Sequence, residues 1–259
     1  CRELKKRFGA FDLSLMNYNA AGPYPSCFNN LSEEEKIEEH FSNLQRNVDY
    51  LYENLKILNS KYFLPFAGAY VLGGKFSYKN KFLGTMSWDK CIELLNKKDN
   101  IHGTEYIALN EGTSFDLNTG LPDTEYQPIN EDEVKLYIDT KLSNLKYPYE
   151  QDDMPEHSQL LNDINDAILA METRLERIKI VPDMMVTLEV FDEEVTIMNT
   201  TETESNGTLK CRMDPRLLRR ILDKSSHWNN AEIGCHIEFD RKPNYYSPDI
   251  HTALQFFHL

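Results

Sequence analysis

The richest group of chemically useful side chains stands near the C-terminal end, where His227, Trp228 and Asn230 lie close together. An indole flanked by an imidazole and a carboxamide sets hydrogen-bond donors beside an apolar floor, as small-molecule pockets do. A structural role fits the same residues, with Trp228 anchoring a core and the asparagine pair forming a turn. No two histidines of the chain lie two or four residues apart, so no strand or helix offers two imidazoles to a metal.

Two loops rich in glycine, proline and aromatic residues form the second candidate site. The loop at 17–25 and the loop at 66–70 each follow a strand-like segment. Ligands of α/β proteins bind at the carboxyl ends of strands, so loops that end neighbouring strands can share one pocket. We predict that both loops line such a pocket. The candidate pocket residues are Tyr18, Asn19, Gly22, Tyr24, Phe66, Gly68 and Tyr70.

Well-known catalytic and metal-binding strings do not occur in the sequence. GxGxxG, GxxxxGK[ST], GxSxG, HExxH and HxHxDH are all absent, so we assign no catalytic residue and no metal ligand. The five cysteines include no Cys-x-x-Cys pair, which argues against a zinc knuckle or a small disulfide scaffold. We expect unpaired and mostly buried thiols in a reducing cytoplasm.

Composition points to an acidic globular protein. The chain has 259 residues, of which 41% are hydrophobic and 27% charged, and its net charge is −14. This charge argues against binding to nucleic acid, which relies on a basic surface. No apolar run approaches the length of a membrane span, so we expect a soluble, cytoplasmic protein without a membrane partner. The chain starts at Cys1 as though within a helix, and we expect it to be part of a longer protein.

The elements that must position the loops are clear in the first 70 residues. Residues 11–16 alternate in polarity as a strand does, and Ser32 with Glu35 forms a capping box that starts a helix reaching residue 58. A single stripe of that helix carries Ile37, Phe41, Leu44, Val48, Leu51, Leu55 and Leu58. A second strand at 61–64 completes a βαβ-type unit, which favours an α/β layered domain.

The remaining elements suggest a second, smaller domain. We predict helices at 88–98, 131–145, 157–180, 215–222 and 248–259, and strands at 185–190, 195–199, 208–213 and 232–239. The dipeptide Asn206-Gly207 predicts a turn between two of these strands. We therefore divide the chain into an α/β domain at 1–150, a helical connector at 151–181 and an α+β tail domain at 182–259.

The two loops and the tail resemble a known family. Residues 12–28, the long helix that follows and residues 64–70 are similar to the second half of a metallo-β-lactamase-fold protein. More narrowly, the string Pro65-Phe66-Ala67-Gly68, the tail at 228–234 and residues 241–243 resemble the branch of CMP-N-acetylneuraminic acid hydroxylase and its bacterial relatives. The resemblance implies the second half of an αββα sandwich.

The resemblance also implies a bound Zn or Fe in a fuller protein, but no metal ligand can be carried over to this chain. The family's HxHxDH string would precede Cys1, and Ala67, which stands where a ligand histidine often follows a proline, has no donor atom.

Three functions follow as expectations. The first is the C-terminal portion of a metal-dependent hydrolase of the metallo-β-lactamase superfamily, which activates a metal-bound water with ligands outside this chain. The second is a hydroxylase-like enzyme acting on a nucleotide-activated sugar of the CMP-sialic acid type, which would need an iron–sulfur electron donor. The third is a non-catalytic binding or scaffold module. All three imply a small-molecule partner such as a sugar or nucleotide sugar, and the first two imply an N-terminal half or a partner chain.

Overall fold

The computed structural model describes residues 1–99, 101, 103–200 and 207–259, which form two compact units. The first unit consists of Cys1–Ala21, Ile37–Val71 and Gly84–Thr140. The second consists of Gly22–Lys36, Leu72–Leu83 and Lys141–Leu259. The unit boundaries therefore differ from the domain limits at 150 and 181 that the sequence suggests, because two early segments belong with the C-terminal part.

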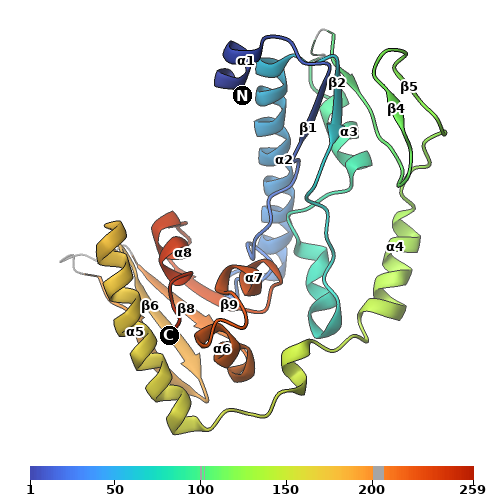
Figure 1. Cartoon of the computed structure of the whole chain (residues 1–259). Helices are drawn as coiled ribbons and strands as arrows, with labels where there is room; N and C mark the ends of the chain where they lie inside the picture. Colours follow the sequence, from blue (N-terminus) through green and yellow to red (C-terminus); the bar gives the residue numbers. More distant parts are fainter. Residues whose placement is uncertain (100, 102, 201–206) are drawn as a thin grey trace. The chain divides into compact units, whose positions relative to one another are not determined.

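The first unit is built around three parallel strands in the order β1-β2-β3 (Figure 1). Their bounds are Leu13–Met16 for β1, Tyr62–Pro65 for β2 and Glu105–Tyr106 for β3. Helix α2 (Glu33–Leu58) connects β1 to β2, which confirms the predicted βαβ unit. Because Met16 pairs with Pro65 at the last position of both strands, the loops that follow leave the sheet at the same edge.

Helix α2 begins as the capping box predicts. The Ser32 backbone N–H donates to Glu35 Oε2 over 2.7 Å, and the Glu35 N–H donates to Ser32 Oγ over 3.2 Å. The stripe from Leu44 to Leu58 is buried and packs on the core of the first unit. Ile37 and Phe41, at the start of the stripe, are exposed, so the apolar pattern extends further than the burial.

Shorter elements complete the first unit. They are α1 (Arg2–Phe8), α3 (Trp88–Asn96), β4 (Phe115–Asp116), β5 (Leu121–Pro122) and α4 (Glu131–Tyr137). The helix predicted at 131–145 is confirmed in its first two turns, after which the chain continues as a π-helical turn, Ile138–Leu142. Ser87 caps α3 by accepting a hydrogen bond from the Lys90 N–H, and this fixes where Trp88 stands.

The second unit contains a four-stranded sheet in the order β7-β6-β8-β9. The strands are β6 (Met185–Val190), β7 (Glu193–Met198), β8 (Thr208–Arg212) and β9 (Glu238–Lys242). Helix α5 (His157–Ile178) lies along this sheet (Figure 1). The first three strands confirm the sequence prediction. Asn206, the first residue of the predicted turn, lies outside the described residues.

The other helices of the second unit are short. They are the 3-10 helices η1 (Gly74–Phe82) and η3 (Pro148–Gln151), and the α-helices α6 (Pro215–Leu222), α7 (Trp228–Ile233) and α8 (Pro248–Leu254). The predicted strand at 232–239 is wrong except for its last two residues, because α7 continues to Ile233 and β9 begins only at Glu238. One turn apart on α7, the Trp228 indole donates to Glu232 Oε1 over 2.9 Å, which favours helix over strand here.

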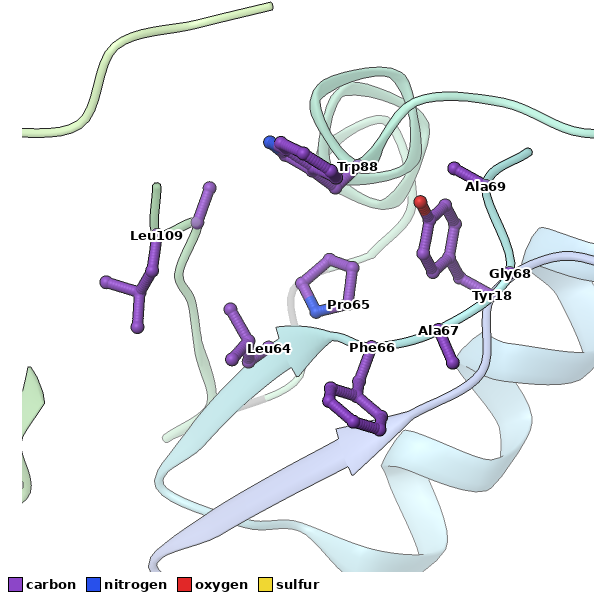
Figure 2. Close-up of a pocket in the computed structure, with 10 residues that line it drawn as sticks. Tyr18, Leu64, Pro65, Phe66, Ala67, Gly68, Ala69, Trp88 and Leu109 are labelled. Atoms are coloured by element: carbon purple, nitrogen blue, oxygen red, sulfur yellow. The ribbon is translucent and has the colours of Figure 1, made fainter. Parts of the chain in front are cut away.

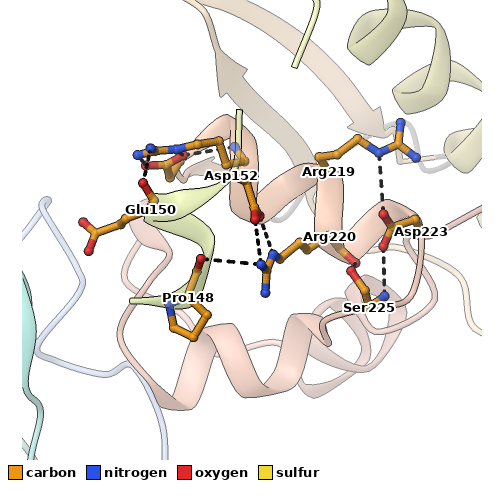
Figure 3. A network of polar contacts seen from close by, with 9 residues as sticks. Pro148, Glu150, Asp152, Arg219, Arg220, Asp223 and Ser225 are labelled. Carbon is orange, nitrogen blue, oxygen red and sulfur yellow. Dashed lines mark hydrogen bonds and ion pairs between the residues drawn. The ribbon is translucent and has the colours of Figure 1, made fainter. Parts of the chain in front are cut away.

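Arginines of α6 hold η3 in place (Figure 3). Arg216 Nη1 donates to the Glu150 carbonyl over 2.9 Å, and Arg220 forms a two-point ion pair with Asp152 in which Nη2 lies 2.7 Å from Oδ1. The guanidinium of Arg220 is therefore already neutralised by a carboxylate.

The chain as a whole is a mixed α/β protein. Each of its five cysteines is free, and four of them are buried, as the sequence predicts. Within the described ranges, every helix is too short or too polar to cross a lipid bilayer.

Candidate functional site

A cavity of about 310 Å³ opens at the carboxyl ends of β1 and β2 (Figure 2). Figure 2 shows Tyr18, Trp88 and Leu109 approaching it from three separate elements. The complete lining is Tyr18, Leu64, Pro65, Phe66, Ala67, Gly68, Ala69, Trp88, Ala108 and Leu109. The structure thus brings three of the sequence candidates, Tyr18, Phe66 and Gly68, around one hollow at the edge of the sheet where ligands of α/β proteins bind.

Tyr18 supplies the one side-chain hydroxyl among these lining residues. It follows β1 directly and is only 3% exposed, because its ring packs into the core beside Cys91 and Phe63. Burial, together with the nearby Cys91, raises the pKa of the Tyr18 phenol to about 12. Tyr18 is therefore an uncharged hydrogen-bond donor and acceptor at physiological pH.

The loop after β2 is shaped by Gly68. Phe66 extends the strand pairing by donating its N–H to the Met16 carbonyl over 3.0 Å, and Ala67 then takes a left-handed φ of 56°. Gly68 has a φ of +123°, and a Cβ there would lie 2.6 Å from Asn17 Oδ1. Only glycine therefore allows the two loops to approach each other this closely.

Trp88 forms another wall of the cavity, and the sequence analysis did not select it. Its indole Nε1 donates to the Tyr126 hydroxyl, which in turn donates to Asp89 Oδ1 over 2.8 Å. Asp89 Oδ2 accepts the Ile129 N–H over 2.9 Å. This chain of hydrogen bonds holds the indole in one orientation. The helix-capping Ser87 just before it was the only local signal that could have located Trp88.

Asn19 has a positioning role. Its side-chain amide donates to the Met86 carbonyl over 2.8 Å and accepts the Met86 N–H over 2.9 Å. Both ends of the amide are therefore used to tie the loop after β1 to the segment before α3. Asn19 is not among the residues that line the cavity, and it acts by holding Tyr18 and Trp88 on segments that are joined to each other.

Gly22, Tyr24 and Tyr70 do not line the cavity either, which corrects the predicted site. The chain passes into the second unit at Gly22, and Tyr24 packs there against Phe28 with ring centroids 5.1 Å apart. The Tyr24 hydroxyl accepts a hydrogen bond of 3.1 Å from Asn244. These contacts place the aromatic ring in the packing of the second unit.

The cluster near the C-terminal end does not form one site. Trp228 is 1% exposed and anchors the core of the second unit, which is the structural role considered for it. His227 and Trp228 border a hollow of about 90 Å³, whereas Asn230 borders a different one of about 180 Å³. Asn230 belongs to α7, so the asparagine pair does not form a turn.

The 180 Å³ hollow is lined by His236, Tyr149 and Arg220, among other residues. His236 Nδ1 lies 3.2 Å from the Tyr149 hydroxyl, and burial lowers the pKa of His236 to about 4. The imidazole is therefore neutral at physiological pH. Since Asp152 already neutralises Arg220, this hollow offers little net positive charge to an anionic ligand.

The donor set of the described residues does not fit the Zn or Fe that the resemblance implies. They contain no group of three His, Cys, Asp or Glu side chains that could hold a metal. The wall of the larger cavity offers the Tyr18 phenol and backbone groups, and Ala67 contributes no donor atom. Zinc in proteins takes Cys, His and carboxylate ligands, so no step through a metal is derived from these residues.

Comparison with known proteins leaves the function to be argued from this geometry. No protein-family model, no curated protein and no solved structure matches the chain.

Proposed function

We propose that the cavity at the carboxyl ends of β1 and β2 binds the uncharged ring of a small organic molecule. One observation carries this proposal. The described side chains that line the cavity are aromatic or aliphatic apart from a single neutral phenol, and none of them is ionised at physiological pH. The volume of about 310 Å³ lies at the lower end of the usual range for small-molecule sites.

The lining narrows the class of ligand. The flat face of Trp88 suits stacking against a nucleobase or a sugar ring, and the Tyr18 hydroxyl suits one hydrogen bond to it. A phosphate or carboxylate on the same molecule would find no cation in this lining and would have to extend beyond it. A sugar or nucleotide sugar would therefore bind through its ring portion.

For the whole protein, we place this site in a metal-dependent hydrolase of the metallo-β-lactamase superfamily, in a cytoplasmic setting. In that role the cavity holds the substrate, and the metal ligands come from outside this chain. The βαβ unit and the pocket formed by its two loops support the proposal. A hydroxylase-like enzyme acting on a nucleotide-activated sugar would use the cavity in the same way.

A non-catalytic binding module is the second candidate function. It is favoured by one specific observation, which is that the described residues offer no metal-binding group while the ligand cavity is well formed. Such a module would bind the same ring without turning it over.

Titration with an uncharged nucleoside, cytidine, tests the binding site. Stacking on Trp88 should quench tryptophan fluorescence to saturation, and Trp88→Phe should abolish the quenching because the remaining Trp228 lies in the core of the second unit. Tyr18→Phe should weaken affinity by about fivefold, the value of one neutral hydrogen bond. Tyr50→Phe is the matched control, since Tyr50 is 75% exposed on α2.

Two outcomes of this titration would contradict the binding proposal. One is a failure of cytidine and of N-acetylneuraminic acid to quench at all. The other is quenching that persists unchanged in Trp88→Phe. Because the metal ligands of the hydrolase would lie outside this chain, elemental analysis of the protein isolated from its source, with everything that stays bound to this chain, then separates the two functions. Bound Zn or Fe supports the hydrolase, and saturable ligand binding by a metal-free isolate supports the binding module.

A further inference from the structure

A cluster of charged groups and thiols lies in the second unit, with three buried members and a carboxylate, Glu238, whose side chain is 33% exposed. It consists of Cys27, Lys79, Cys235 and Glu238, which come from three segments of the chain. Both cysteines are 0% exposed and Lys79 is 2% exposed. Lysine is almost never buried this deeply without partners, so the cluster calls for a chemical explanation.

The contacts in the cluster converge on the Lys79 ammonium. Lys79 Nζ donates to Cys27 Sγ over 3.7 Å and to the Cys235 carbonyl over 3.2 Å. It also lies 3.3 Å from Glu238 Oε1. The two thiols also influence each other, in the sense that lowers the pKa of Cys27 and raises that of Cys235.

The backbone holds these segments in fixed register. The Phe239 N–H donates to the Cys27 carbonyl over 2.8 Å, and the Asn29 N–H donates to the Phe239 carbonyl over 2.7 Å. The rings of Phe28 and Phe239 stack with centroids 5.1 Å apart. The segment that carries Cys27 is therefore paired with the start of β9, directly after Cys235.

The charges around Cys27 favour its thiolate. The neighbouring Cys235 lowers the pKa of Cys27, and Lys79 adds to this effect against the opposing cost of burial. The same interaction raises the pKa of Cys235, which stays a thiol. Burial opposes the charge of Lys79, but Cys27 and Glu238 outweigh it and raise the pKa of the ammonium.

The carboxylate of the cluster and one further cation, Lys36, complete its charges. Burial favours the protonated form of Glu238, yet the hydrogen bond from Asn29 and the charge of Lys79 hold its pKa below the usual value. Lys36 on α2 adds positive charge near Cys27, although burial lowers the pKa of Lys36. Cys27 thus stands among two ammonium groups, one carboxylate and one thiol.

The other two buried cysteines provide an internal contrast. Cys91 and Cys211 are also 0% exposed, but neither has a cation beside it. Burial alone raises the pKa of Cys91 to about 12, and burial also raises the pKa of Cys211. Thiols of this kind are inert, because the thiolate is the nucleophile.

We propose that Cys27 and Cys235 form a peroxide-oxidisable dithiol site, in which hydrogen peroxide converts the pair of thiols into a disulfide. The geometry supports this directly, since one buried ammonium group bridges the two cysteines: Lys79 Nζ lies 3.7 Å from Cys27 Sγ and 3.2 Å from the Cys235 carbonyl. Peroxide-sensitive sites pair a low-pKa thiol with a resolving thiol and admit the oxidant. Because both cysteines are 0% exposed, peroxide reaches this pair through local opening of the second unit.

The reaction has two steps, and its atoms and electrons balance. Cys27 thiolate attacks one peroxide oxygen, the O–O bond breaks, and hydroxide leaves while Cys27 becomes a sulfenic acid. Cys235 sulfur then attacks the Cys27 sulfur, forming the S–S bond and releasing a second hydroxide. The Cys235 proton converts one hydroxide into water, and the proton that Cys27 released on forming its thiolate converts the other. Two thiols and one peroxide therefore give one disulfide and two waters. Lys79 keeps Glu238 as its partner afterwards.

The test treats the folded full chain with hydrogen peroxide at neutral pH, followed by denaturation, alkylation and peptide mass spectrometry. A Cys1→Ser background is used, because Cys1 is exposed and could link two molecules. We expect a Cys27–Cys235 disulfide, while Cys91 and Cys211 in the same molecules remain alkylatable. Equal oxidation of all four cysteines, a Cys27–Lys79 cross-link, or no oxidation of the folded chain would overturn the proposal.

Variants separate the roles of the two partners. Cys235→Ser should stop the reaction at Cys27 sulfenic acid, which dimedone labels, and Cys91→Ser should leave the disulfide yield unchanged. Lys79→Met should slow oxidation by about tenfold or more, because Cys27 loses the cation that favours its thiolate. If Lys79→Met does not fold, the proposal is tested instead by the pH dependence of the oxidation rate of the parent chain. The oxidation rate should stay constant between about pH 7 and pH 9, whereas a rate that rises tenfold per pH unit there would contradict the proposal.

Discussion

One buried cluster in each unit of this protein holds its polar groups in the opposite way. In the first unit, Tyr18 and Cys91 lie against one apolar core, and burial raises the pKa of each to about 12, so both are neutral. In the second unit, Lys79 and Cys27 are just as buried, but their contact favours the charged form of each.

This difference separates recognition from reactivity. A neutral lining can accept an uncharged ring with little desolvation cost, which suits a binding cavity. A buried ion pair is expensive to form and is seldom needed for stability, so its presence suggests a chemical role. The following three variants test each side of the contrast, beginning with the largest expected effect.

Lys79→Met should disrupt the charged cluster of the second unit. It removes the only ammonium group in direct contact with both Cys27 and Glu238 among the described residues, and leaves two acidic groups without their shared partner. We expect the free energy of unfolding to fall by about 3 kcal/mol in urea denaturation at neutral pH.

Lys75→Met is the control for that substitution. Lys75 lies on the same short helix and pairs with Glu150 at 3.1 Å, but its side chain is 42% exposed. Its loss should cost less than about 1 kcal/mol. Equal losses in the two variants would mean that burial does not distinguish the Lys79 cluster.

Gly68→Ala should disrupt the neutral cavity of the first unit. The added Cβ meets Asn17 Oδ1 at 2.6 Å, in a backbone conformation with φ of +123°. We expect a loss of about 1–3 kcal/mol in the free energy of unfolding and a loss of cytidine binding, because the loop after β2 must move. Gly22→Ala, where a Cβ meets nothing within 4 Å, should change stability by no more than about 0.5 kcal/mol. Unchanged stability and binding in Gly68→Ala would show that the two loops are not held together.

His236→Gln should have the smallest effect, and it should alter the free energy of unfolding only at acidic pH. Burial, and then the charges of Lys75 and Lys79, lower the pKa of folded His236 from 6.5 to about 4. The unfolded chain therefore binds a proton first as the pH falls, so the contribution of His236 is complete above pH 6.5 and is lost toward pH 4. Urea denaturation across that range should show a shallower decline for His236→Gln.

Local patterns allowed much of the fold to be predicted. The capping box at Ser32 and the stripe ending at Leu58 are signals within one helix, and α2 begins and ends where they indicate. The pairing of β1 with β2 could also be expected, because a long helix between two strands favours a parallel arrangement. This parallel pairing correctly predicted that Tyr18 and Phe66 lie at the same edge of the sheet.

The remaining features depend on contacts between distant residues. Lys79 meets residues 52 and 156 positions away, which no local pattern encodes. The segment from Gly22 leaves the first unit, so candidates that adjoin Tyr18 in sequence do not join its cavity. The error at 232–239 arose because the alternation in the sequence looked like a strand, whereas the Trp228–Glu232 hydrogen bond supports a helical turn.

The contrast between the Cys27–Lys79 cluster and the neutral buried thiols is tested most directly by NMR of the chain labelled with ¹³C at cysteine Cβ, since this nucleus reports whether each sulfur is a thiol or a thiolate. At neutral pH we predict a thiolate signal for Cys27 and thiol signals for Cys91 and Cys211, with Cys91 still protonated when the pH is raised to about 10. A Cys27 that remains a thiol until about pH 9, as an ordinary cysteine does, would contradict the account.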